Sequence, residues 1–244
     1  MTAPSRLGVL GGMGPLATAD FLKKIVQATS AERDQDHLPV VVYSVPQIPD
    51  RLDPILRGAG ESPLPAMIEG MQTLEAAGAD YVAIPCITAH HWYEALRRAT
   101  KMPILHIADA TCTVLNECGV ATDKVGVLAT AATLRSGFFQ TRLRALGYET
   151  VVPPEREMQE LVLPAIACVK RGDMARALGL ATQAVERLLA RDVETIVLAC
   201  SELPPALEGA NAGLVARCVD SLDALARACV FWGLKGSPAE SAIK

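Results

Sequence analysis

Two cysteines occupy matching places in the two halves of this chain, and each ends an apolar run. The segment 81–85 leads into Cys86, and the segment 195–199 leads into Cys200. Each cysteine is followed by a turn that carries a hydroxyl side chain and then by helix-forming residues. A thiol between a strand C-terminus and a helix N-terminus lies where a thiolate is stabilised. Two such thiols in a pseudo-symmetric pair indicate a site that acts on both faces of one small molecule.

Other segments recur in the same order as the cysteines. The Gly-Val-Leu segment at 8–10 returns at 126–128, and the segment 107–110 resembles 218–221. Apolar strands resemble one another in any α/β chain, which is the alternative explanation. We favour an ancient duplication with small deletions, because the residues that could carry chemistry repeat as well.

Short apolar runs alternate with helical patterns along the whole chain, which predicts an α/β fold with mainly parallel sheets covered on both faces. With the duplication, this predicts two pseudo-symmetric lobes, each a four-stranded, mainly parallel sheet flanked by helices. The candidate strands are 7–10, 40–44, 81–85, 104–107, 125–128, 149–152, 196–199 and 215–219.

The predicted domain boundaries follow from this order of elements. We expect a first lobe of residues 1–106 plus 214–244 and a second lobe of residues 107–213, with the last strand and helix returning to the first lobe. Parallel sheets bind ligands outside the carboxyl ends of their strands. Both cysteines lie at such ends.

The composition limits the classes of partner. The chain has 244 residues, of which 50% are hydrophobic and 4% aromatic, so Ala, Val, Leu and Ile must fill the core. A net charge of −4 without a basic run argues against nucleic acid, and no apolar stretch is long enough for a membrane span. The start of the chain does not resemble a signal peptide. Seven cysteines without CxxC spacing predict reduced thiols in a cytoplasmic protein.

The Gly-Gly-Met-Gly-Pro turn at 11–15 follows the first predicted strand. Its amides, around Gly12 and Gly14, could hold a carboxylate or phosphate. The turn also fits a dinucleotide fingerprint, but the second strand ends without the acidic residue that would bind a ribose, so we reject a dinucleotide. A tight turn without a ligand remains an equal alternative.

Three further positions could contact an anion. Arg51 follows a stiff proline-containing loop, and its planar fork suits a carboxylate, although a surface ion pair with a neighbouring aspartate is the simpler interpretation. Thr130 and Thr133 could donate hydroxyls at a helix entrance or only cap the helix. Lys170 lies near a helix C-terminus, where the dipole alone favours a cation.

Several chemistries lack their motifs. His90-His91 is not HExxH and no other ligand cluster is visible, so we expect no metal. No GxSxG elbow is present, which argues against a serine hydrolase. We assign the other five cysteines to packing.

The chain closely resembles the aspartate/glutamate racemase family, in its aspartate racemase branch. The resemblance covers nearly the whole chain and rests on six motifs in order, at 11–18, 34–39, 48–51, 85–90, 128–130 and 200–202.

The resemblance implies a cofactor-independent amino-acid racemase with its active site in the cleft between two lobes, usually a homodimer, acting on aspartate or a related acidic amino acid. Cys86 and Cys200 would be the paired acid/bases, with Arg51 and Lys170 as substrate-binding cations. We expect further substrate contacts from Gly12, Met13, Gly14, Thr88, Thr130, Thr133, Ser201 and Glu202.

The chain departs from the family pattern beside the first cysteine. Asn is common in the family where Ile87 and Val45 stand, and Thr is usual where Ser201 stands. Both lost amides are expected near polar ends of the substrate. Alternatives are therefore a same-fold hydantoin racemase, malonate decarboxylase or maleate isomerase, or a non-catalytic protein that binds a small acid. Two intact cysteines favour racemisation, because decarboxylation and isomerisation each use one thiol.

Overall fold

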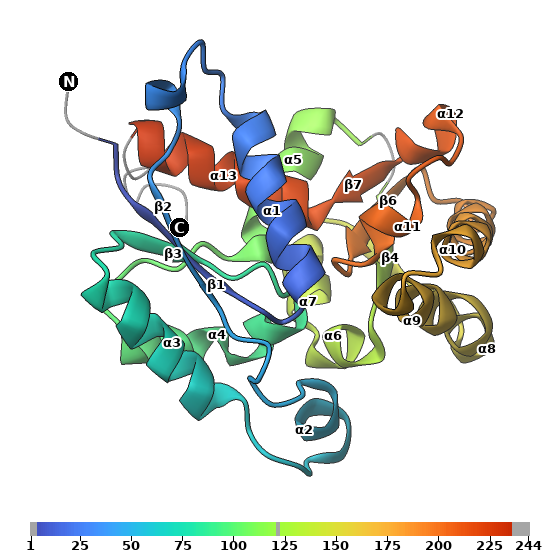
Figure 1. Cartoon of the computed structure of the whole chain (residues 1–244). Coiled ribbons are helices and arrows are strands. Elements are labelled where there is room, and N and C mark those ends of the chain that lie inside the picture. The colour runs from blue at the N-terminus through green and yellow to red at the C-terminus, as the bar shows by residue number, and fades with distance from the viewer. Residues whose placement is uncertain (1–3, 121–122, 236–244) are drawn as a thin grey trace. The chain divides into compact units, whose positions relative to one another are not determined.

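The computed structural model describes residues 4–120 and 123–235, which form an α/β fold with two parallel sheets (Figure 1). The chain divides into two compact units. The first unit comprises residues up to 50, 61–107 and 222 onward, and the second comprises 51–60 and 108–221. The predicted fold class of two α/β lobes is confirmed, with three strands in one sheet and four in the other. Within the described residues, no helix is long and apolar enough to cross a membrane.

The first unit is built on a parallel sheet with the strand order β2-β1-β3. Its helix α13 starts one residue before the unit boundary at Leu222. The elements are β1 (Leu7–Gly11), α1 (Pro15–Ala28), η1 (Asp34–Asp36), β2 (Val40–Ser44), α3 (Leu64–Ala76), β3 (Tyr81–Ala83), η2 (Thr88–Trp92), α4 (Tyr93–Ala99) and α13 (Ser221–Lys235).

Burial explains why the central strand is continuously apolar. Every residue of β1 is buried, and both α1 and α3 pack against this strand. The edge strand β2 alternates between partly buried and exposed residues at its end, as expected for a strand with one open side. A core cluster that includes Leu10, Met71, Val82 and Leu96 fills the unit.

The fourth strand predicted for this sheet is reduced to one bridge, between Val82 and Ile104. The Val82 amide donates to the Pro103 carbonyl and the Leu105 amide donates to the Val82 carbonyl. The ladder then stops, because the Ile107 amide donates to a histidine ring instead of to the strand.

The second unit contains a parallel sheet with the strand order β5-β4-β6-β7. The helix α5 starts at Ile107, the last residue of the first unit's middle segment. The elements are α2 (Leu52–Arg57), α5 (Ile107–Cys118), β4 (Lys124–Ala129), α6 (Ala131–Ser136), α7 (Phe138–Ala145), β5 (Glu149–Val151), α8 (Glu155–Glu157), the π-helical turn η3 (Met158–Val162), α9 (Leu163–Arg171), α10 (Met174–Leu189), β6 (Thr195–Ala199), α11 (Leu203–Ala206), α12 (Ala212–Val215) and β7 (Cys218–Asp220).

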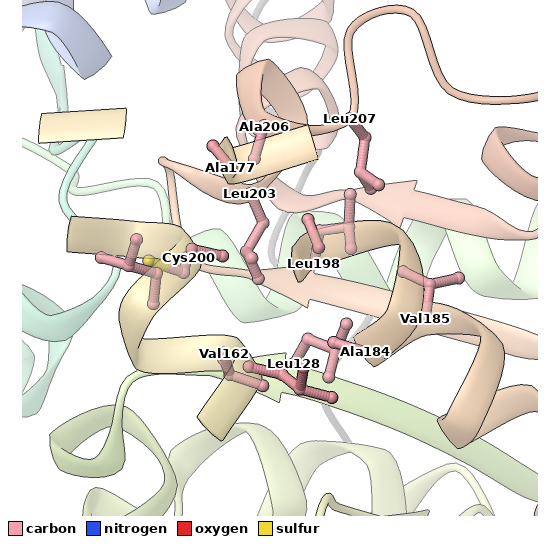
Figure 2. Close-up of a cluster of buried hydrophobic side chains, with 14 of the residues drawn as sticks. Leu128, Val162, Ala177, Ala184, Val185, Leu198, Cys200, Leu203, Ala206 and Leu207 are labelled. Carbon is pink, nitrogen blue, oxygen red and sulfur yellow. The ribbon is translucent and has the colours of Figure 1, made fainter. Parts of the chain in front are cut away.

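The core of the second unit lies between its central strands and the helices α9, α10 and α11. Figure 2 shows Leu128 and Leu198 from β4 and β6 beside Ala184 and Val185 from α10. The same close-up shows Cys200 within this apolar cluster. The Cys200 thiol is therefore buried in a packed apolar environment.

The domain boundaries differ from the prediction at two places. The last strand, β7, completes the second sheet instead of returning to the first lobe. It pairs in parallel with β6, since residues 196–198 have backbone groups available for hydrogen bonds to residues 218–220. Only α13 returns to the first unit. Residues 51–60 also belong to the second unit, since α2 packs against α6. Residues 1–3 and 236–244 of the predicted first lobe lie outside the described residues.

The turn after β1 depends on Gly12. Its φ of +92° lies in the left-handed region, and a Cβ atom there would come within 2.3 Å of the Val45 backbone nitrogen. The Val45 amide also donates to the Gly11 carbonyl at 3.2 Å. The absent side chain therefore lets the segment after β2 lie directly against the turn.

We predict that Gly12→Ala destabilises the protein strongly. Backbone strain costs about 1–3 kcal/mol, and overpacking against a main chain that cannot move aside adds about 1–3 kcal/mol. The matched control is Gly179→Ala, an exposed site in α10 with open space around it, which should gain about 0.5–1 kcal/mol. Urea unfolding measures both changes, and equal midpoints for Gly12→Ala and the parent protein would refute the prediction.

Candidate active site

Four of the predicted site residues lie together in the second unit. Cys200 directly follows β6, and its Sγ donates a hydrogen bond to Oε2 of Glu202 at 3.0 Å. The Ser201 hydroxyl donates to the same carboxylate oxygen at 3.1 Å. The Lys170 Nζ, in the last turn of α9, lies 3.9 Å from Oε1 of Glu202. The carboxylate of Glu202 is therefore the centre of this group.

Cys200 is held as a thiol. Burial raises the pKa of its thiol well above the ordinary value, and the charge and hydrogen bond of Glu202 raise it further, while Lys170 opposes this. The sequence predicted the reverse, a thiol whose pKa is lowered by a helix N-terminus. That prediction is wrong for Cys200, because the following helix α11 has only four residues and desolvation penalises the charged form.

Cys86 lies three residues beyond the end of its strand. The strand β3 ends at Ala83, and Cys86 is 6% exposed. Its carbonyl accepts hydrogen bonds from the Ala89 amide at 3.2 Å and from Nδ1 of His90 at 3.1 Å. Thr88, a predicted substrate contact, is buried at the start of η2. This thiol is therefore carried by a compact turn instead of by the sheet.

The glycine-rich turn uses part of its hydrogen-bonding capacity internally. The Gly12 amide donates to Oγ1 of Thr18 at 2.9 Å, and this hydroxyl donates to the Gly14 carbonyl at 3.0 Å. Met13 is buried in the core of the first unit. Space is open beside the Gly14 Cα. Of the three predicted contacts in this turn, Gly14 has the most room for a ligand.

Arg51 immediately precedes α2 and is half-buried. The Asp53 carboxylate pairs with Arg57 at 3.5 Å, one turn along the same helix. Thr130 caps α6, since its Oγ1 accepts from the Thr133 amide at 3.2 Å and donates to the Thr133 hydroxyl at 3.0 Å. The cap that the sequence indicated for this helix is thus present, and Thr133 is buried.

The other five cysteines differ in their surroundings. Cys112, Cys168 and Cys229 are buried and Cys218 is partly buried, whereas Cys118 at the end of α5 is exposed, so its assignment to packing is wrong. All seven cysteines, which lie in the described part of the chain, are reduced thiols. Burial raises the pKa of Cys112 and of Cys218 to about 11. A raised pKa leaves less of each thiol as the nucleophilic thiolate.

Two features were not recognised from the sequence. One is the hydrogen bond between the Cys200 thiol and the carboxylate of Glu202, a residue that was expected only to contact the substrate. His90 was considered only as a metal ligand, yet it is buried and hydrogen-bonded beside Cys86. Its place four residues after Cys86, one turn of helix away, was the available signal.

Comparison with known proteins gives concordant results. The family model "Asp/Glu/Hydantoin racemase" matches residues 10–229. The chain is 30% identical over 208 residues to the broad specificity amino-acid racemase RacX of Bacillus subtilis (strain 168), an alignment that covers 83% of this chain and 87% of RacX.

Solved structures agree. The aspartate racemase of Picrophilus torridus superposes with a TM-score of 0.79 at 33% identity, covering 93% of each chain. An aspartate racemase homologue from Pyrococcus horikoshii OT3 superposes with a TM-score of 0.74 at 23% identity, covering 94% of this chain and 99% of that one, which shows the shared fold. With a family model matched over most of its length, this chain belongs to the Asp/Glu/hydantoin racemase family.

Proposed function

We propose that this protein is a cofactor-independent amino-acid racemase that uses Cys86 and Cys200 as its two acid/base groups. One observation carries the proposal. Each thiol follows the third strand of its unit, β3 or β6, and these strands occupy equivalent places beside the central strands β1 and β4. The family membership of the chain supports the same reaction class.

Racemisation needs a proton removed from one face of the α-carbon and another delivered to the opposite face. One thiolate takes the α-proton and becomes a thiol, and the second thiol gives its proton to the carbanion and becomes a thiolate. The two groups exchange roles for the other enantiomer. Each proton transfer by a positioned group contributes about 10²–10⁴-fold to the rate.

The protonation of Cys200 makes the two directions unequal. In the resting protein Cys200 is the group ready to donate a proton, so we assign the base to Cys86 for the enantiomer whose α-proton faces that residue. In the reverse direction Cys200 must lose its proton first. We assign its acceptor as Oε2 of Glu202, the atom that already accepts the thiol hydrogen bond.

We propose that Arg51 and Lys170 bind the substrate carboxylates and that Gly14 and Thr130 complete the contacts. The Arg51 guanidinium offers two parallel donors, which suit a carboxylate. Positive charge close to the α-carboxylate stabilises the carbanion as it forms. The expected homodimer stays a prediction.

The proposed substrates are amino acids beyond aspartate alone. Ile87 is 3% exposed and Val45 packs against the core of the first unit. Both side chains are apolar, so neither offers the side-chain amide of an asparagine to a polar group of the substrate. A relative that covers most of the chain is described as a broad specificity amino-acid racemase. We therefore expect acidic amino acids to be accepted together with less polar ones.

The two-thiol mechanism predicts a distinct pattern for single cysteine variants. Cys86→Ser and Cys200→Ser should each lower racemisation by about 10²–10⁴-fold, because each removes one of the two proton donors or acceptors. Each should still exchange the α-proton of the one enantiomer whose face keeps its thiol. Proton NMR in heavy water measures exchange, and polarimetry measures racemisation.

The exposed Cys118 provides the control for these variants, since Cys118→Ser should behave as the parent protein. Full racemisation by Cys200→Ser would exclude the two-thiol mechanism and favour a one-thiol reaction.

Glu202→Gln should lower the pKa of the Cys200 thiol. Burial still raises that pKa, but the negative charge that disfavours the thiolate is gone, and Lys170 no longer has a carboxylate beside it. Modification of Cys200 by a small methanethiosulfonate, followed peptide by peptide with mass spectrometry, should then begin at lower pH than in the parent protein. Glu208→Gln, at an exposed position nearby, is the control. A profile that stays in place or moves to higher pH contradicts the assignment.

Restoring the two amides tests the substrate range. Val45→Asn combined with Ile87→Asn should raise kcat/KM for aspartate by about 10–100-fold, since a hydrogen bond to a charged group is worth about 1.5–3 kcal/mol. Activity on alanine or leucine should fall. Val42→Asn, on the exposed face of β2, controls for added polarity. If the parent protein already prefers aspartate and the double variant is no better, these two positions serve packing only.

A further inference from the structure

The buried His90 connects the turn that carries Cys86 to the start of α5. The ring is 3% exposed. Its Nδ1 lies 3.1 Å from the Cys86 carbonyl oxygen, and its Nε2 accepts a hydrogen bond from the Ile107 amide at 3.3 Å. Both ring nitrogens are thus engaged with backbone atoms, one on Cys86 and one on Ile107, which lies 17 residues after His90.

The hydrogen-bond partners assign the position of the ring proton. A backbone amide can only donate, so Nε2 must carry the lone pair that faces Ile107. The proton of the neutral ring therefore lies on Nδ1 and is donated to the Cys86 carbonyl. Aromatic neighbours enclose the ring: His106 meets it edge-on with centroids 4.8 Å apart, and Tyr93 is stacked at 6.5 Å. These contacts and the two hydrogen bonds favour the orientation that the ring has.

The backbone around Cys86 depends on these bonds because the sheet does not extend to it. β3 ends at Ala83, and Pro85 has no N–H to contribute to a ladder. Within the turn, the Ala89 amide donates to the Cys86 carbonyl and the His90 amide donates to the Ile87 carbonyl. The hydrogen bond from Nδ1 is an additional constraint on the Cys86 carbonyl. Through the ring and its Nε2 atom, this carbonyl is linked to Ile107, after which the chain passes into the second unit.

We propose that His90 is a positioning residue for the Cys86 thiol, which it holds by its hydrogen bond to the Cys86 carbonyl. This inference rests on the proposed function, in which Cys86 exchanges a proton with the substrate. The two hydrogen bonds of the ring go to backbone atoms, so they act on the geometry of the turn. A displacement of about 1 Å at a reacting group can cost on the order of 10²-fold in rate.

Three variants separate the two bonds of the ring. His90→Leu removes both bonds but keeps the site apolar. His90→Asn keeps a side-chain N–H near the position of Nδ1, so it can still donate to Cys86. His90→Gln places its amide near the position of Nε2, so it can still accept from Ile107. The neighbouring His91 is exposed, and its ring meets that of Trp92 in a T-shaped contact with centroids 4.9 Å apart. His91→Asn is therefore the matched control.

Two measurements are made on each variant. The first is racemisation, separated into kcat and KM. The second is the rate at which iodoacetamide alkylates each cysteine, mapped by mass spectrometry. The buried Cys168 and Cys229 report on the fold within the same molecule.

We expect His90→Leu to lower kcat by about 10–100-fold with little change in KM, and to speed alkylation of Cys86 while Cys168 and Cys229 stay protected. His90→Asn should restore both properties more fully than His90→Gln. His91→Asn should match the parent protein.

Other outcomes overturn the proposal. Equal acceleration at all three buried cysteines would show a general loss of fold. Better recovery by His90→Gln than by His90→Asn would show that the bond to Ile107 matters and the bond to Cys86 does not. If the parent protein racemises nothing, the proposed function fails, but selective alkylation of Cys86 in His90→Leu still decides whether His90 positions this turn.

Discussion

The end of each parallel ladder is the constraint on which the candidate site depends. In the second unit, β6 pairs with β4 up to Ala199, and Cys200 is the next residue. In the first unit, β3 pairs with β1 only up to Ala83, three residues before Cys86. The sheet's hydrogen bonds fix the position of a residue next to a ladder, whereas the backbone of a residue beyond the ladder must be held by other hydrogen bonds. The two thiols are equivalent in topology but differ in how their backbones are held.

The difference extends to their electrostatics. Cys200 lies in a packed apolar cluster beside a carboxylate, and both surroundings favour the neutral thiol. The positive charge of Lys170, whose side chain is more exposed and lies 3.9 Å from Oε1 of Glu202, opposes this effect of the carboxylate. A thiol between a carboxylate and an apolar core is a poor base at rest, which is why the proposed reaction gives the two thiols unequal tasks.

The two units resemble each other in packing as well as in strand order. Gly8 in β1 and Gly126 in β4 are the equivalent glycines of the two central strands. A Cβ at Gly8 would meet Ala79 at 2.9 Å, and a Cβ at Gly126 would meet Leu188 at 2.9 Å. Both halves therefore keep a strand position without a side chain, so that neighbouring apolar groups approach the sheet closely. The repeated Gly-Val-Leu segment has this physical meaning.

The sequence by itself determined the class of fold, the places of the central strands, both cysteines and the family. These features depend on local patterns, such as the continuous apolar runs around Val9 and Val127, which are read within a few residues. The motifs likewise identify chemistry by residue type and spacing.

Only the tertiary structure decided the partner of β7, the loss of a fourth strand around Ile104 and the protonation of Cys200. Strand partners are chosen by hydrogen bonds between remote segments, as in the pairing of Val197 with Val219. The pKa of a thiol depends on what surrounds it in space, and burial outweighs a four-residue helix. The physical reason is the same in each case: these properties belong to groups that fold together, and nothing in the local sequence specifies which groups those will be.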